Sequence, residues 1–324
     1  MVSHLARWMR VGALLGFALA MGVTPARSQS ATVERPRITG ISHVAYFVSD
    51  MTKAIAFWHD FLGYNVAYET KKPGTDEPGV AHVKINDRQH VELVSERSPA
   101  PPSMMRDVCF STDNAEKMRE YLAAKGVKVP AGVTKTATGD IGFEIRDPDG
   151  TAVEFVQVLP AGKEAEGAGT FLPGTRISDQ IYHVGFVVGN AQRALEFYGK
   201  VLGFHETWRG SPRPDELSWI NMMVPDGTDY VEFMLYRDHP KDYGTSNHVA
   251  LAVKSIPKAA EVLQSRAAAA HYTREMQPRV GVNQKRQLNL FDPDGTRVEL
   301  MEPVTVTGKP TPSSTAPFPP PAHE

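Results

Sequence analysis

The sequence predicts an α+β fold in which one strand–helix–strands unit occurs four times, two in each half of the chain. The first observation is a repeat: Ile41-Ser42-His43-Val44 returns as Ile181-Tyr182-His183-Val184, at a spacing of 140 residues (183 − 43). The second is that a strand-like run followed by an amphipathic run appears twice within each half. A repeat of this length is a duplicated structural unit, so the architecture follows from one copy.

Each half opens with a strand and a helix. The run 44–48 is strand-like, and the apolar positions from 51 to 62 follow the i, i+3, i+4, i+7 spacing of one helix face. Gly63 suits the end of that helix, where a left-handed backbone is common. The second half repeats this face over 191–202 and closes it with Gly203.

The remaining elements follow the same order in both halves. Each half closes with an Asp-Pro-Asp-Gly turn, starting at Asp147 and at Asp292, before a last strand. The β-rich runs, the restart strands and the second helices are expected at 81–85, 91–94, 107–111 and 114–125 in the first half, and at 219–224, 230–235, 248–253 and 257–268 in the second.

Composition divides the chain into five parts. Residues 1–28 are expected to be an export signal, 39–160 the first copy, 161–178 a linker rich in Gly, Ala and Glu, and 179–303 the second copy. Residues 304–324 are rich in Pro, Ser and Thr, which predicts a disordered tail.

The export signal rests on a short basic region with Arg7 and Arg10, followed by an apolar run at 11–23 and a stop near Ser28. A membrane anchor is the alternative, but a span needs about 20 apolar residues. We therefore expect cleavage, no stable membrane span afterwards, and a periplasmic or secreted protein. Cys109 is the only cysteine, so an intramolecular disulfide is excluded, and its apolar neighbours predict a buried side chain.

The charge balance excludes one class of partner. The chain has 35 Lys and Arg against 37 Asp and Glu, with a formal net charge of −2. Nucleic-acid-binding proteins carry a basic run or face. No such run occurs in this sequence, so no nucleic-acid partner is expected.

Three motifs carry a resemblance to a known family. They are "His-Val-x-Phe/Tyr-x-Val" at 43 and 183, "Phe-Tyr/Trp-x-x-x-Leu-Gly" at 57 and 197, and "Asp-Pro-Asp-Gly-x-x-x-Glu" at 147 and 292. Together they resemble the vicinal oxygen chelate superfamily, which includes glyoxalase I, extradiol dioxygenases and bleomycin-resistance proteins. The resemblance implies tandem βαβββ modules, four in all, that form two glyoxalase-like, cup-shaped open barrels around metal ions.

The resemblance also implies a ligand set in the second copy. His183, Glu232, His248 and Glu299 match the four positions of glyoxalase I-like members. Two imidazoles and two carboxylates suit a divalent ion such as Ni, Zn, Co, Mn or Fe(II). Such an ion would bind a small substrate through two neighbouring oxygens. The alternative for each single residue is a hydrogen-bonded or solvated side chain.

The first copy keeps His43, Glu92 and Glu154 but has Asp107 where the second copy has a histidine. This difference favours a degenerate metal site in the first copy. A second site remains open, because aspartate binds hard metals. His90 is another possible ligand, since it lies two residues before Glu92 and therefore on the same strand face.

The reaction is narrowed by departures from the family pattern. The arginine expected four residues after the first histidine is replaced by Val187, and the tyrosine expected of extradiol dioxygenases is replaced by Asn289. The sequence therefore favours a lyase or isomerase of glyoxalase type, with Glu232 or Glu299 as the catalytic base. An extradiol-type dioxygenase that uses His183, His248 and Glu299, and a protein that only binds a small molecule, are the alternatives.

The substrate would be bound inside the second cup. The residues expected to line this cup are Trp208, Trp219, Met222, Tyr236, Arg279, Lys285 and Arg286.

The chain is expected as a monomer with an internal pseudo-dimer or as a homodimer.

Overall fold

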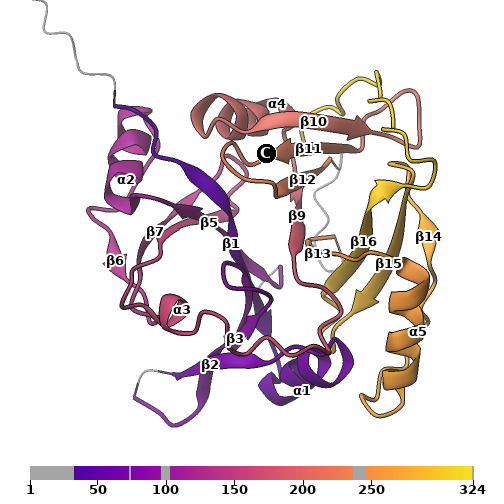
Figure 1. The fold of residues 1–324 in the computed structure, drawn as a ribbon. Helices are drawn as coiled ribbons and strands as arrows, with labels where there is room; N and C mark the ends of the chain where they lie inside the picture. The colour runs from indigo at the N-terminus through magenta and orange to yellow at the C-terminus, as the bar shows by residue number, and fades with distance from the viewer. Residues whose placement is uncertain (1–32, 73, 96–102, 236–245, 323–324) are drawn as a thin grey trace, which may run out of the picture. The chain divides into compact units, whose positions relative to one another are not determined.

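A computed structural model describes residues 33–72, 74–95, 103–235 and 246–322. These residues form two eight-stranded sheets with few helices, as the α+β prediction requires (Figure 1). The expected export signal, 1–28, lies outside the described residues. Within the described ranges, no helix has both the length and the apolar character needed to cross a bilayer.

The first sheet is made by two βαβββ units of the first copy. Its strand order is β2-β3-β4-β1-β5-β8-β7-β6. β1 pairs in parallel with β4, β5 pairs in parallel with β8, and the antiparallel β1–β5 pair joins the two units. The strands are β1 Ile38–Val48, β2 Val66–Lys71, β3 Pro78–Lys84, β4 His90–Ser95, β5 Met105–Thr112, β6 Thr134–Lys135, β7 Ile141–Arg146 and β8 Ala152–Gln157.

The second sheet repeats this topology in the order β10-β11-β12-β9-β13-β16-β15-β14. The duplication predicted from the repeat is thus confirmed at the level of strand order. In Figure 1 the first sheet runs from indigo to magenta and the second from rose to yellow. The strands are β9 Ile181–Val188, β10 His205–Gly210, β11 Trp219–Met223, β12 Tyr230–Leu235, β13 His248–Ala252, β14 Arg279–Val280, β15 Lys285–Phe291 and β16 Arg297–Thr305.

The first helix of each copy changes from α to π geometry after its first turn. Both begin at a side-chain cap, since Asp50 accepts a hydrogen bond from the Lys53 amide and Asn190 accepts one from the Arg193 amide. The sequence predicts one continuous helical face and does not predict the π turn. The helical segments are α1 Met51–Ala56, η1 Phe57–Phe61, α2 Ala115–Ala124, α3 Lys163–Glu166, α4 Ala191–Ala194, η2 Leu195–Val201 and α5 Ile256–Ala267.

The two copies share reciprocal hydrogen bonds and one hydrophobic core. Gln89 Oε1 accepts from the Ile181 amide at 2.8 Å, and Asp229 Oδ2 accepts from the Ile41 amide at 3.1 Å. Each residue is 140 positions from its counterpart (229 − 89 and 181 − 41). Contacts that repeat with exchanged partners are the mark of two-fold symmetry. The copies are thus related as an internal pseudo-dimer.

The segment expected as a linker contains the short helix α3. It is fixed to the first copy, because Lys84 Nζ donates to the Gly167 carbonyl and the Gly169 amide donates to Asp87 Oδ1 at 2.8 Å. A composition rich in Gly and Ala predicts flexibility, but these contacts supply partners that composition does not reveal.

The segment expected as a disordered tail lies beside β10, where the chain is yellow in Figure 1. The Ser314 amide donates to the Arg209 carbonyl at 2.9 Å, the Leu217 amide donates to the Pro317 carbonyl at 2.8 Å, and Ala316 is buried. This differs from the prediction for residues 304–324. The physical reason is that an extended Pro-rich segment can still pair single backbone groups with an edge strand.

Candidate metal centre

Four acidic and histidine side chains come from the four central strands of the second sheet. His183 lies on β9, Glu232 on β12, His248 on β13 and Glu299 on β16. Gly185, two residues after His183, is paired with both Glu232 and His248, and the residue opposite His183 on β13 is also opposite Glu299. Alternate residues of a strand share a face, so all four side chains lie on the same face.

The donor atoms of these side chains converge. The distances from His183 Nε2 are 3.1 Å to His248 Nε2, 3.5 Å to Glu299 Oε2 and 4.0 Å to Glu232 Oε2. Those from His248 Nε2 are 3.4 Å to Glu299 Oε2 and 3.7 Å to Glu232 Oε2. Metal–ligand bonds of about 2.0–2.2 Å put neighbouring ligands about 3 Å apart. The spacing therefore fits one common ion, with the two histidines already at ligand separation.

Gly185 makes room for the ring of His248. A Cβ atom at Gly185 would lie 2.0 Å from His248 Cε1 and 2.5 Å from Nδ1. Two carbon atoms cannot approach this closely without overlapping. The absence of a side chain at Gly185 is therefore a condition for the position of this imidazole.

Neighbouring groups orient both rings. His248 Nδ1 lies 2.9 Å from the Ser246 carbonyl. Arg297 Nη2 contacts the same nitrogen and the same carbonyl. His183 is held by stacking on Tyr230, with ring centroids 4.6 Å apart. Burial lowers the pKa of His248 to about 3, and Arg297 adds to this effect, so the ring is neutral at pH 7.

The two carboxylates have different electrostatic environments. Burial raises the pKa of Glu299, but hydrogen bonds with His183 and His248 outweigh it and hold the pKa well below its ordinary value. Burial raises the pKa of Glu232, and the negative charge of Glu299 adds to this effect although His183 opposes it. Two carboxyl groups whose environments separate their pKa values are suited to different roles at one site.

A cavity of about 220 Å³ lies directly over the cluster. Glu232 and Glu299 form part of its wall. A neighbouring cavity of about 410 Å³ shares Trp208 and Asn283 with it and is walled by residues of the C-terminal segment, including Gly308 and Thr311. Within the described residues, Trp208 Nε1 is buried without a hydrogen-bond partner. A bound molecule could satisfy this donor.

The structure tests the expected lining residues individually. Trp208, Trp219 and Arg279 line the cavity over the cluster, and Lys285 lines the neighbouring one, where Nζ donates to Tyr182 Oη at 2.9 Å. Two of the expectations are wrong: Met222 is in the hydrophobic core, and Arg286 is exposed and faces Glu302. Both occupy alternate positions on their strands, whose side chains point to the other face. Tyr236 lies outside the described residues.

Arg297 is a cavity residue that was not predicted from the sequence. It lines the cavity with Glu232 and Glu299 and contacts His248. The sequence could have indicated this role, because Arg297 lies two residues before Glu299 on the same strand and both side chains are therefore on one face.

The corresponding residues of the first copy also converge. His43 Nε2 lies 3.7 Å from Glu92 Oε1, 3.7 Å from Asp107 Oδ1 and 3.5 Å from Glu154 Oε2. Asp107 also forms an ion pair with Arg106. The first copy therefore retains a cluster, but with one imidazole fewer at these four positions.

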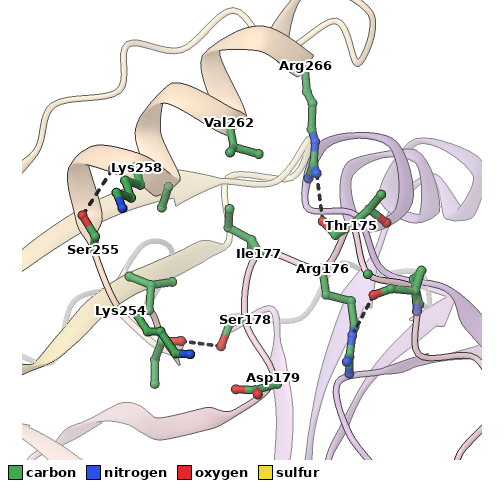
Figure 2. Close-up of a pocket in the computed structure, with 15 residues that line it drawn as sticks. Thr175, Arg176, Ile177, Ser178, Asp179, Lys254, Ser255, Lys258, Val262 and Arg266 are labelled. Carbon is green, nitrogen blue, oxygen red and sulfur yellow. Dashed lines mark hydrogen bonds between the residues drawn. The ribbon is translucent and has the colours of Figure 1, made fainter.

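A further cavity of about 430 Å³ lies between α5 and the segment that connects the copies (Figure 2). Arg266 crosses it and donates to the Thr175 carbonyl at 2.8 Å and the Phe61 carbonyl at 3.1 Å. Its lining includes none of the four clustered residues of the second copy. Its hydrogen bonds join the connecting segment to α5, which is a structural role.

Comparison with known proteins identifies the class. The sequence profile of the Glyoxalase/Bleomycin resistance protein/Dioxygenase superfamily matches residues 40–155 and 180–300. The chain belongs to this superfamily, and the resemblance inferred from the three motifs is confirmed.

Individual relatives have several activities. The chain is 24% identical over 275 residues to lactoylglutathione lyase GLX1 of Arabidopsis thaliana, covering 80% of this chain and 90% of that protein. It is 33% identical over 127 residues to virulence protein STM3117 of Salmonella typhimurium, covering 38% of this chain and 86% of that protein. A match to 4-hydroxyphenylpyruvate dioxygenase of Yarrowia lipolytica is 25% identical but spans 55% of that protein and 57% of this chain.

Solved structures share the fold. The Mn(II)-bound glyoxalase from Novosphingobium aromaticivorans has a TM-score of 0.62 and 20% identity, with 87% of each chain covered. An extradiol ring-cleaving dioxygenase from B. fuscum also has a TM-score of 0.62, with 16% identity over 89% of this chain and 78% of that one.

Proposed function

We propose that the chain is a divalent-metal-dependent enzyme of the glyoxalase, lyase or isomerase type that acts on a small substrate with two neighbouring oxygens. The observation that carries the proposal is the convergence of His183, Glu232, His248 and Glu299 beneath a cavity of about 220 Å³. A mixed imidazole and carboxylate set suits Ni, Zn, Co, Mn or Fe(II). The relative named as a Mn(II)-bound glyoxalase supports this metal class.

Glu299 and Glu232 would have different roles in the reaction. A divalent ion bound here supplies Lewis-acid stabilisation of negative charge on substrate oxygens. Glu299 lies within 3.5 Å of both histidine Nε2 atoms, so it serves as a ligand. Glu232 lies further from both, at 3.7 and 4.0 Å, and faces the cavity. We assign Glu232 as the base that takes a proton from a carbon next to a carbonyl group.

The cavity wall would orient the substrate. Arg279 and Arg297 present guanidinium groups and Trp208 and Trp219 present aromatic faces. Guanidinium groups bind carboxylate and phosphate oxygens in pairs. An anionic substrate with an apolar body fits this lining.

An extradiol-type dioxygenase is the second candidate. It is supported by the likeness to the B. fuscum dioxygenase fold and by His183, His248 and Glu299, which form a two-histidine, one-carboxylate triad. Glu232 disfavours it, because a second carboxylate, 3.7 and 4.0 Å from the two histidine Nε2 atoms, lies beside the positions that dioxygen and substrate need. Ligand binding without turnover remains the third candidate.

The test uses the full chain, freed of metal and reloaded with each candidate ion. Turnover of 2-oxoaldehydes and thioesters is measured beside oxygen uptake with catechols. We expect isomerase or lyase turnover that falls by more than about 100-fold in His248→Ala, because a lost ligand costs more than the 10–100-fold typical of outer contacts. Glu232→Gln should keep the ion and lose turnover. His205→Ala, an exposed histidine of the same copy, is the control.

Catechol-dependent oxygen uptake without lyase or isomerase activity would favour the dioxygenase. Tight ligand binding without turnover for any ion would favour the binding protein. An intact ion content in both His183→Ala and His248→Ala would contradict the site itself.

A further inference from the structure

The first copy contains a histidine cluster that the second copy lacks. His90 Nε2 and His82 Nδ1 each lie 3.3 Å from Glu92 Oε1, and His43 Nε2 lies 3.7 Å from the same oxygen. The rings of His43 and His90 stack with centroids 4.7 Å apart. Three imidazoles therefore surround one carboxylate oxygen.

Strand register explains why these side chains meet. On the parallel β1–β4 pair, His43 is directly opposite His90, and on the antiparallel β3–β4 pair, His82 is opposite Glu92. In the second copy the positions with the same register are occupied by Tyr230, opposite His183, and Asn221, opposite Glu232. The additional histidines thus belong to the first copy alone, and compensate in number for the histidine that Asp107 replaces.

The cluster is buried, and its polar atoms are only partly satisfied. His43 is 4% exposed and His82 is 3% exposed. Within the described residues, both ring nitrogens of His43 and Nδ1 of His82 lack a hydrogen-bond partner. Leaving such groups unpaired costs about 1–3 kcal/mol each. A cation bound at the cluster would use the lone pair of the unpaired His43 ring.

Helix α3 covers this cluster. Glu164 Oε1 lies 3.4 Å from His90 Nδ1, and the segment is held by the Lys84 to Gly167 bond. The cavity that remains beside His82 and His90 is about 30 Å³. This cavity is smaller than the one over the second-copy cluster, so an ion bound here would have a structural role.

We propose that the first copy binds its own transition-metal ion, of the Zn or Co(II) class, through His43, His90 and Glu92. These three side chains offer ligand atoms that lie within 4.8 Å of one another. We include Glu154 as a fourth ligand, because its Oε2 atom lies 3.5 Å from His43 Nε2. Glu164 orients His90 from its other ring nitrogen, as outer carboxylates do for metal-bound histidines.

This ligand set differs from the four positions carried over by the family resemblance. Two imidazoles and two carboxylates form an N/O set that suits Zn or Co(II). The donor His90 replaces the missing histidine from a different strand, β4 instead of β5.

The experiment measures metal content per chain after loading with Zn or Co(II) and removal of excess ion. We expect two ions in the unchanged protein, one in His90→Tyr and one in His248→Ala. Tyrosine is the residue at the equivalent position 230, so it preserves a stacked ring while removing the ligand. His59→Ala removes a histidine whose side chain is 55% exposed and should leave two ions.

The retained ion in His90→Tyr reports that the variant is folded. The failure of this proposal is distinguishable from failure of the proposed function. An unchanged content in His90→Tyr overturns the first-copy site, whereas an unchanged content in His248→Ala overturns only the second-copy site.

Cobalt spectra supply a second readout. Cys109 and Glu154 also lie within ligand distance of His43. In Co(II)-loaded His248→Ala, the spectrum should lack a thiolate-to-cobalt band in the near ultraviolet. Such a band would place the ion on Cys109 and overturn the assignment to His90.

Discussion

Gly185 and Ala45 occupy equivalent positions in the two copies, and each faces the residue that differs between the two clusters. Gly185 is paired with His248 on β13, and Ala45 is paired with Asp107 on β5. The glycine leaves space for an imidazole, whereas the alanine accompanies a shorter carboxylate. The ligand and the space for it therefore change together.

Gly185→Ala should displace His248 without removing any ligand. The added Cβ would lie 2.0 Å from His248 Cε1, so the ring must move. We expect metal affinity of the second copy to fall by about 10–100-fold, the range for changes that disturb a ligand's support. Titration calorimetry measures this. Gly199→Ala is the matched control, because its nearest contact would be 3.8 Å away. Equal affinity in both variants would show that Gly185 has no such role.

The Asp-Pro-Asp-Gly turn of the first copy contains a carboxyl group, that of Asp147, whose protonation should make the stability of the fold depend on pH. Asp147 is buried and accepts a hydrogen bond from Tyr198 Oη of the second copy at 3.1 Å. Burial raises its pKa to about 6, and Asp149 adds to the increase. Because the folded pKa exceeds the unfolded value, the folded protein binds this proton more tightly. The stabilisation is present below about pH 4 and is lost as pH rises through about 6.

Asp147→Asn should remove this dependence. Relative to the unchanged protein, its free energy of unfolding should rise by up to about 3 kcal/mol between pH 4 and pH 7. Urea unfolding at both pH values gives the difference. Asp76→Asn, at a side chain that is 97% exposed, should give the same difference at both pH values. A constant offset for Asp147→Asn would contradict the raised pKa.

At the scale of elements, apolar periodicity predicted the central strands and both second helices, and it failed at the sheet edges. β2 and β10 are terminal strands in their sheets, and the periodicity did not predict them. Most of their side chains are half-buried or exposed, so the contrast between a buried face and a solvent face is weak. The four proposed ligand positions of the second copy came from the family resemblance. Arg297 was missed because its meaning depends on strand register.

The C-terminal segment makes contacts with the rest of the fold, whereas its composition predicts a disordered tail. Gly308 and Thr311 form part of the wall of the cavity of about 410 Å³. Thr311 Oγ1 donates to the Asn283 carbonyl at 2.6 Å. Residues further along carry the contacts with β10. These two roles lie on consecutive stretches of chain, so they can be separated by truncation.

Two shortened chains test the tail. Chains ending at Thr305 and at Thr311 should both melt about 2–4 °C lower, since each loses contacts worth about 1–2 kcal/mol and the shift per kcal/mol is about 2 °C for a chain of this size. Only the shorter chain loses the cavity wall, so it alone should bind a substrate or inhibitor about 10-fold more weakly. Calorimetry and a binding titration measure the two effects. Identical affinity in both chains would exclude the segment 306–311 from ligand binding.

At the scale of the molecule, the two copies have a common core. Phe61 stacks on Tyr272 with centroids 4.2 Å apart, and Phe110 contacts Phe204 at 5.2 Å. These aromatic contacts join residues of different copies. Because neither copy buries its apolar surface alone, the described chain should unfold in one transition, which the repeat in the sequence could not predict.

Gln89→Ala should destabilise both copies together. The substitution leaves the buried Ile181 amide without its acceptor, at a cost of about 1–3 kcal/mol. The unfolding curve should shift and remain a single transition. Arg88→Ala, at an exposed neighbour, should change stability by less than about 0.5 kcal/mol. Two separate transitions in Gln89→Ala would show that the copies fold independently.

The pairing of Ala45 with Asp107 constrains how the copies could have diverged or could be interconverted. A histidine introduced at 107 would meet the Ala45 methyl group, since the equivalent ring of His248 lies 2.0 Å from where such a carbon would stand. Ala45→Gly alone costs only about 1 kcal/mol. A mutational path between the two ligand sets therefore has a preferred order, in which the glycine precedes the imidazole when a site is gained and outlasts it when a site is lost.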